Sequence, residues 1–140
     1  MTYVDTSVLV AYYCPEPLSA KAHRVLRRQG GLAISWLVEV ELVSALARKI
    51  RTREMRPADG HRVHALFQSH LEQGIYTRLA LDQQQFAKAR EWLATFRLRL
   101  TALDALHAAV AAIQGCLLLT ADAALAKACA KLGVAALLIS

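Results

Sequence analysis

The sequence predicts an α/β fold in which a five-stranded parallel sheet is covered by helices on both faces. Five short apolar runs alternate along the chain with longer segments of helical periodicity. Glycines stand where helix C-caps belong. The 140 residues, 56% of them hydrophobic, fit one domain over residues 1–140 with an ample core.

Each apolar run is short enough for a strand and is followed by a helical segment. The expected strands are Thr2 to Asp5, Leu32 to Ser35, Ile75 to Leu79, Cys116 to Thr120, and Ala135 to Ile139. A parallel sheet binds its ligands at the carboxyl ends of such strands.

The helices between them have recognisable ends. The expected segments include Leu37 to Ile50, His61 to Gln73, Asp82 to about Thr95, Ala102 to Gln114, and Ala123 to Leu132. Gly74, Gly115 and Gly133 follow three of these segments as C-caps, and Asp82 with Gln85 predicts a capping box.

Composition narrows the class of protein. Cys14, Cys116 and Cys129 are odd in number and form no Cys-x-x-Cys pair, which argues against a disulfide framework and a zinc ribbon. No basic leader or apolar run of about 20 residues is present, so we expect a soluble cytoplasmic protein without a membrane partner. The net charge of +6 fits either a polyanionic partner or a surface that is basic only for solubility.

Four acidic residues lie in apolar surroundings: Asp5, Glu41, Asp104 and Asp122. A buried carboxylate is costly without a partner, and a cluster of them would favour a hard divalent cation with oxygen ligands. The three aspartates also have a simpler interpretation, because each stands where it could cap a helix. All three lie at junctions that a parallel sheet would gather along one edge.

Glu41 has no capping role because it falls inside the helix expected over Leu37 to Ile50. Glu39 competes with it, but two residues turn a helix by about 200°, so only one of the two can face the cluster. Ser44 and Ala45 give Glu41 small neighbours on its own face, which favours Glu41.

In this order the acidic motifs resemble those of the PIN-domain nucleases, and most of all a VapC-type toxin. The matching segments are Val4-Asp5-Thr6-Ser7, Glu41 within Ile34-Ser35 to Leu46, Leu103-Asp104-Ala105-Leu106-His107, and Leu119-Thr120-Ala121-Asp122. The resemblance implies a PIN-like three-layer sandwich with a five-stranded parallel sheet. It also implies an Mg²⁺- or Mn²⁺-dependent endoribonuclease, homodimerisation, and inhibition by a small cognate antitoxin.

The residues themselves allow the same chemistry. A metal-activated water could attack an RNA phosphate while Asp5, Glu41, Asp104 and Asp122 hold the ion, so no side-chain nucleophile is required. Thr6 and Thr120 could support the carboxylates or the water through their hydroxyl groups.

Other residues leave alternatives open. Arg97 and Arg99 could flank RNA or simply form the exposed side of an extended stretch. The basic segment from Arg48 to Pro57 could contact phosphates or be a solvated helix end. His107 could support the site or be a satisfied core histidine. Trp36 and Trp92 are expected in the core.

Two competing functions remain. A phosphoaspartyl phosphatase would need a second aspartate two residues after Asp5, where this chain has Ser7. A non-catalytic RNA-binding or interaction module of the same fold is the other alternative.

Overall fold

The computed structural model describes residues 1–140, which form five strands and seven helices. In chain order the elements are β1 (Thr2–Val4), α1 (Thr6–Tyr13), α2 (Ser19–Arg27), β2 (Leu32–Ser35), α3 (Trp36–Arg51), α4 (Pro57–Glu72), β3 (Tyr76–Leu79), α5 (Gln83–Leu93), α6 (Ala102–Gln114), β4 (Leu117–Thr120), α7 (Ala123–Leu132) and β5 (Ala136–Leu138). All five predicted strands are present, each within one residue of its predicted ends at either side.

The strands form one parallel sheet in the order β3-β2-β1-β4-β5. β1 lies at the centre, where Thr2 is in register with Leu32 of β2 and Leu117 of β4. The predicted α/β fold is therefore confirmed. Since β1, β2 and β4 are adjacent, the segments that follow them leave the same edge of the sheet side by side.

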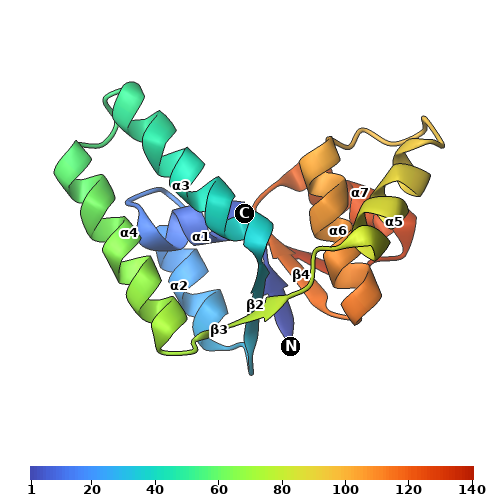
Figure 1. Cartoon of the computed structure of the whole chain (residues 1–140), viewed down its shortest axis with the longest axis horizontal. Helices are drawn as coiled ribbons and strands as arrows, with labels where there is room; N and C mark the ends of the chain where they lie inside the picture. Colours follow the sequence, from blue (N-terminus) through green and yellow to red (C-terminus); the bar gives the residue numbers. More distant parts are fainter.

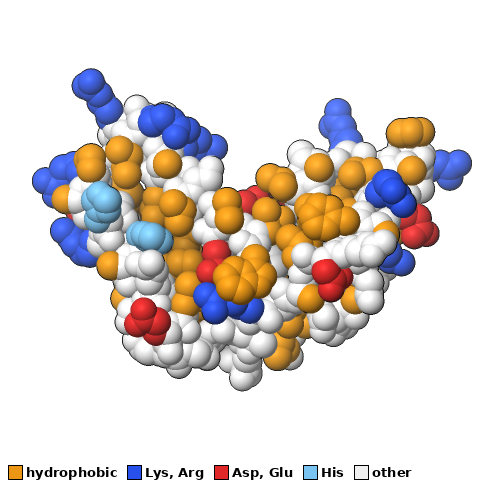
Figure 2. All heavy atoms as spheres, in the orientation of Figure 1, with side chains coloured by type: hydrophobic (Ala, Val, Ile, Leu, Met, Phe, Trp, Pro, Cys, Tyr) orange, Lys and Arg blue, Asp and Glu red, His pale blue; other side chains and the backbone are white.

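Helices cover the sheet on both faces and make a three-layer structure. Figure 1 shows α1 to α4 on one side of the sheet and α5 to α7 on the other. The two groups of helices extend past the sheet as two arms. The space-filling view in Figure 2 shows a hollow between the arms, with hydrophobic side chains on its walls.

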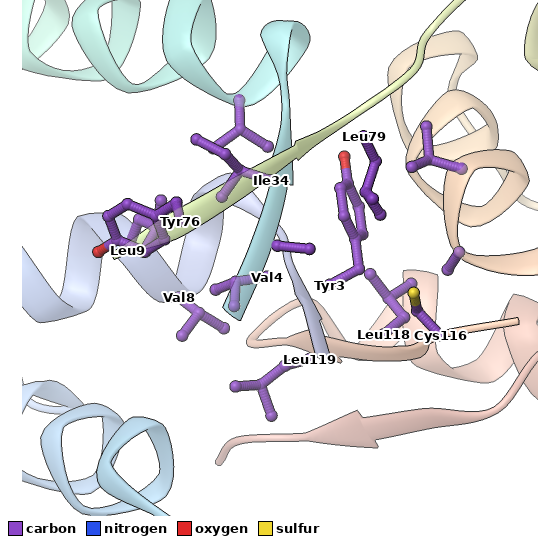
Figure 3. Close-up of a cluster of buried hydrophobic side chains, with 14 of the residues drawn as sticks. Tyr3, Val4, Val8, Leu9, Ile34, Tyr76, Leu79, Cys116, Leu118 and Leu119 are labelled. Carbon is purple, nitrogen blue, oxygen red and sulfur yellow. The ribbon is translucent and has the colours of Figure 1, made fainter. Parts of the chain in front are cut away.

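The central strands are buried on both faces, as near-continuous apolar runs in a parallel sheet require. Tyr3 and Val4 point to opposite sides of β1, and Leu118 and Leu119 do the same in β4 (Figure 3). All four side chains are fully buried. Each such burial stabilises the fold by about 1.5–3 kcal/mol, so the central strands are fixed firmly beneath the residues that follow them.

The helix ends follow local sequence signals. Gly74, Gly115 and Gly133 all have positive φ angles, as the predicted C-caps require, and the Asp82–Gln85 capping box is complete. The predicted start of α4 at His61 is four residues late, because Pro57 occupies the first turn, where its missing N–H costs nothing.

The cysteines agree with the sequence analysis, whereas Trp36 does not. The three cysteines are free and buried, as expected of a chain without disulfides. Trp36, expected in the core, is 58% exposed. It begins α3 just outside the sheet, and the guanidinium of Arg78 stacks over its ring at 4.4 Å, which satisfies one face of the indole in solvent.

Candidate active site

Asp5 and Asp122 follow the neighbouring strands β1 and β4 and also cap the helices that begin there. The Asp5 carboxylate accepts a hydrogen bond from the Val8 amide of α1 at 3.3 Å. The Asp122 carboxylate accepts one from the Ala124 amide of α7 at 2.9 Å. These two aspartates thus both cap a helix and lie at the same edge of the sheet.

The Asp5 carboxylate is held by two hydroxyl groups. Ser7 donates to its Oδ1 and Thr120 donates to its Oδ2. The Thr120 oxygen also accepts from the Asp122 amide at 3.0 Å, so one hydroxyl connects the two aspartates. Burial raises the pKa of Asp5, because desolvation outweighs the bonds from Ser7 and Thr120.

Glu41 faces the same region from α3. Its Oε1 accepts from the Thr6 hydroxyl at 2.8 Å and from His107 Nε2 at 2.5 Å. Burial alone would raise the pKa of Glu41, but His107 and Thr6 outweigh it and the pKa is lowered. Glu39 faces another way and forms a bidentate pair with Arg78 at 2.8 and 3.1 Å.

Asp104 lies in the first turn of α6, where its amide donates to the capping Thr101 hydroxyl at 3.3 Å. Its carboxyl group is partly buried. Burial and then the negative charge of Asp122 raise its pKa, with a further contribution from Asp5, although Thr101 and His107 act in the opposite direction. Asp104 therefore lies within the field of two other site carboxylates.

A cleft of about 570 Å³ opens beside these residues along α1 and α3. Thr6, Ser7 and Glu41 line one part of it, and Arg48 and Arg51 of α3 line another. In Figure 2 Lys and Arg side chains stand at the tips of both arms, including the arm that carries the end of α3. The cleft thus joins an acidic part to a basic part.

Arg97 and Arg99 lie outside this cleft, exposed in the segment between α5 and α6. Arg97 lines a separate hollow with Lys131 of α7. The neighbouring Leu98 and Leu100 are partly buried, as the alternating pattern of this segment predicts.

The four acids share a region but do not converge on a single ion position in this structure. No group of three or more His, Cys, Asp and Glu side chains is arranged to hold a metal ion. The carboxylates of Asp5 and Glu41 are bonded to hydroxyl and imidazole groups instead. The chemistry of the set nevertheless fits a hard divalent cation, since every donor is a carboxylate oxygen and none of the four acids pairs with Lys or Arg.

Comparison with known protein families gives one decisive result. The PIN domain family matches residues 2–131. This chain belongs to the PIN domain family. No curated protein matches the sequence.

Solved structures share the PIN fold at low sequence identity. VapC20 of Mycobacterium tuberculosis, described as a sarcin-ricin loop cleaving toxin, is 20% identical with a TM-score of 0.75, covering 91% of this chain and 95% of its own. A chain of VapBC2 from Rickettsia felis, bound to a promoter DNA fragment, is 16% identical with a TM-score of 0.72 and full coverage of both chains. A toxin-antitoxin complex from Klebsiella pneumoniae contains a chain 15% identical, with a TM-score of 0.65 and 87% coverage of each. None of the helices of this PIN domain is long and apolar enough to cross a membrane.

The sequence left His107 with two interpretations and did not single out Tyr3 or Ser35. In this PIN domain His107 is buried and bonded through both ring nitrogens, to Tyr3 and to Glu41. It therefore contacts the site directly. Tyr3 and His107 are 104 residues apart, and no local pattern in the sequence signals such a pair.

Proposed function

We propose that this chain is a single PIN domain that acts as an Mg²⁺- or Mn²⁺-dependent endoribonuclease, the toxin of a toxin-antitoxin pair. One observation carries the proposal. Asp5, Glu41, Asp104 and Asp122 gather beside an open cleft without a single Lys or Arg partner, in a chain that has 17 such residues. Carboxylates that lie in one another's field without Lys or Arg partners favour a bound cation.

The four carboxylates would hold one or two ions. When bound, Mg²⁺ or Mn²⁺ lowers the pKa of a water and stabilises charge on the phosphate under attack. The Thr120 hydroxyl orients Asp5 and the Thr6 hydroxyl orients Glu41, so both threonines fix carboxylates rather than act as nucleophiles. Ser7 is likewise engaged with Asp5, which leaves a phosphoaspartyl mechanism without its general acid.

RNA is the proposed substrate, and it would lie across the cleft with its backbone near Arg48 and Arg51. These cations form no ion pair with an acidic side chain and are exposed in the same cleft as Glu41. Arg97 and Arg99 remain a second, more distant rim for the strand. The likeness to a toxin described as cleaving the sarcin-ricin loop agrees with an RNA substrate. We expect the activity in the cytoplasm.

A small antitoxin is the proposed inhibitor, and a homodimer the proposed assembly. The likeness to a chain of a toxin-antitoxin complex supports the first. Trp36, Val40 and Val43 form an exposed apolar stripe on α3, a surface that a partner would cover. We expect the antitoxin to place an Arg against the acidic cluster, because a guanidinium binds carboxylates bidentately and stays charged when buried.

The proposal is tested with purified protein and a pool of total RNA under single-turnover conditions. We expect cleavage with Mg²⁺ or Mn²⁺ and none in EDTA. The cleavage rate of Asp104→Asn and of Asp122→Asn should fall by more than about 100-fold, which exceeds the effect of changing a residue that only orients a ligand. Full activity in either variant would contradict the mechanism.

The alternative is a non-catalytic PIN domain that binds RNA or protein. The engagement of Asp5 and Glu41 by hydroxyl and imidazole groups of the protein is the observation that favours it. Retention of RNA without any cleavage at saturating Mn²⁺ would support this alternative.

A further inference from the structure

A chain of buried polar groups leads from β2 to the Glu41 carboxylate. The Ser35 hydroxyl lies 2.8 Å from the Tyr3 hydroxyl, which lies 2.7 Å from His107 Nδ1. His107 Nε2 then contacts Glu41 Oε1. Ser35 and Tyr3 are 0% exposed and His107 is 2% exposed, so these bonds are shielded from water. Four elements, β2, β1, α6 and α3, each contribute one member.

When the His107 ring is neutral, the bonds have a single consistent direction. A carboxylate only accepts, so His107 Nε2 donates to Glu41. In the neutral ring Nδ1 must then accept, and the Tyr3 hydroxyl donates to it. The Tyr3 oxygen in turn accepts from Ser35. Every hydrogen has one partner, and no buried side-chain polar atom of the protein lacks one.

Ser35 takes part in this series of hydrogen bonds instead of capping α3. It occupies the N-cap position of α3, where a serine hydroxyl usually accepts from the first turn of the helix. No such cap bond is made, and the hydroxyl contacts Tyr3 instead. A buried polar group destabilises the fold, relative to an apolar group at the same position, unless its hydrogen bonds are made. The arrangement is thus organised around the Tyr3 hydroxyl.

The chain of bonds controls which oxygen of Glu41 is available. Oε1 accepts from both Thr6 and His107, whereas Oε2 accepts from no protein group. We infer that Ser35, Tyr3 and His107 are positioning residues that lock the Glu41 carboxylate and keep its Oε2 free for a divalent cation. This inference rests on the proposed function, because it assigns Glu41 to the cation site.

Tyr3→Phe tests the inference with the smallest change. It keeps the ring and removes the hydroxyl that donates to Nδ1. Nδ1 then has no hydrogen-bond donor, so the imidazole ring is held through Nε2 alone and supports the Glu41 carboxylate less rigidly. We expect the affinity for Mn²⁺ to fall by about 10–100-fold, as with other groups that orient metal ligands.

Mn²⁺ binding by the full chain is measured by titration calorimetry for Tyr3→Phe, His107→Leu and His107→Gln. Gln retains an amide donor near the position of Nε2, so His107→Gln should bind Mn²⁺ better than His107→Leu. The matched control is Tyr12→Phe, since the Tyr12 hydroxyl makes no hydrogen bond and its ring stacks on His23, away from the site. It should bind like the wild type. RNA cleavage lost in Tyr3→Phe should recover as Mn²⁺ is raised, which a merely destabilised fold would not show.

A second readout needs no metal. Nitrogen chemical shifts of the His107 ring should show hydrogen on Nε2 and a hydrogen-bonded Nδ1 in the wild type, and an Nδ1 that has lost its hydrogen bond in Tyr3→Phe. Ser35→Ala supplies a second variant if Tyr3→Phe does not fold. Unchanged Mn²⁺ affinity together with an unchanged Nδ1 chemical shift in the folded variant would overturn the inference. A wild-type protein that binds no Mn²⁺ would overturn the proposed function, and the ring shifts would then decide alone whether the chain of bonds orients Glu41.

Discussion

At the scale of single residues, Asp104 and Glu41 show how neighbours give carboxyl groups opposite tendencies. Asp104 is partly buried beside the charges of Asp122 and Asp5, and its pKa is raised. Burial acts on Glu41 in the same direction, but the bonds from His107 and Thr6 prevail and its pKa is lowered. Two acids of one site therefore respond to pH with opposite signs.

Asp104 makes the protein less stable as pH rises. Its folded pKa lies above the ordinary value of 3.8, so the folded chain binds the proton more tightly than the unfolded chain does. Stability from this group is complete below 3.8 and is lost as pH rises through the folded pKa. Asp104→Asn should therefore raise the melting temperature in EDTA at about pH 7.5 by a few degrees and have less effect near about pH 4.

Thermal unfolding of the two proteins across this pH range measures the effect. The Glu41 contribution, which is lost as pH falls, is common to both proteins and cancels in the comparison. A difference in melting temperature that is independent of pH would contradict the assigned repulsion.

The residues of the site were predictable where a local pattern marks them. Asp5 and Asp122 each follow a strand and cap the next helix, so their place at the sheet edge follows from the strand order, whereas Asp104 is marked by the capping Thr101 of its own helix. The partners of His107 could not be predicted, because Tyr3 is 104 residues away in the sequence and meets His107 only in the folded protein. The carboxylate positions of Asp5 and Glu41 are also set by hydrogen bonds from residues distant in the sequence, which no local pattern signals.

At the scale of elements, α3 provides a matched pair of acids two residues apart. Glu41 faces the cleft, and Glu39 pairs with Arg78 on another side of the helix. Glu41→Gln should abolish most RNA cleavage. Glu39→Gln should leave cleavage unchanged and lower the free energy of unfolding by no more than about 1 kcal/mol, as is usual for a partly exposed ion pair.

Single-turnover cleavage and denaturant unfolding of both variants check this assignment. Loss of cleavage in Glu39→Gln, or retention of cleavage in Glu41→Gln, would contradict the assignment of Glu41 to the active site.

Helix α6 ends at Gly115, whose left-handed backbone conformation suits glycine. Gly115 has a φ of +65°, and an added β-carbon would meet no atom within 4 Å. Gly115→Ala should therefore cost about 1–2 kcal/mol through the backbone alone. Gly31→Ala is the control, since Gly31 also has open space but no positive φ, and it should be neutral or slightly stabilising. Urea unfolding of both variants gives the comparison, and equal effects would show that the backbone conformation is not the cause.

The elements were largely predictable because their signals are local. Apolar runs mark the strands, and glycine or capping residues mark the helix ends. The start of α4 was not predictable because a proline can stand in a loop as well as in the first turn of a helix, and the exposure of Trp36 was not predictable because a large aromatic side chain gives no sign of the Arg78 that covers it.

At the scale of the whole molecule, charge is divided between the acidic region and the basic end of one cleft. RNA binding should therefore weaken with salt, and Arg48→Ala should reduce the slope of log affinity against log salt by about 0.7, the value for one phosphate contact of a single strand. Fluorescence anisotropy with a short single-stranded RNA, in an Asp104→Asn background that prevents cleavage, measures it.

Arg99→Ala in the same experiment tests the other proposed rim. Arg62→Ala serves as the control, because Arg62 lies on α4, pairs with Asp59 and does not line the cleft. An unchanged slope in Arg48→Ala would remove this end of the cleft from the RNA path.

The central place of β1 also has a consequence for synthesis on the ribosome. Asp5 receives one of its hydrogen bonds from Thr120, a residue 115 positions later, and β1 pairs with β4 only after most of the chain has emerged. A nascent chain therefore carries Asp5 and Glu41 long before Asp104 and Asp122 exist to join them. Under the proposed function, translation itself delays the onset of toxicity, and an antitoxin that recognises the acidic cluster can do so only once the protein is nearly complete.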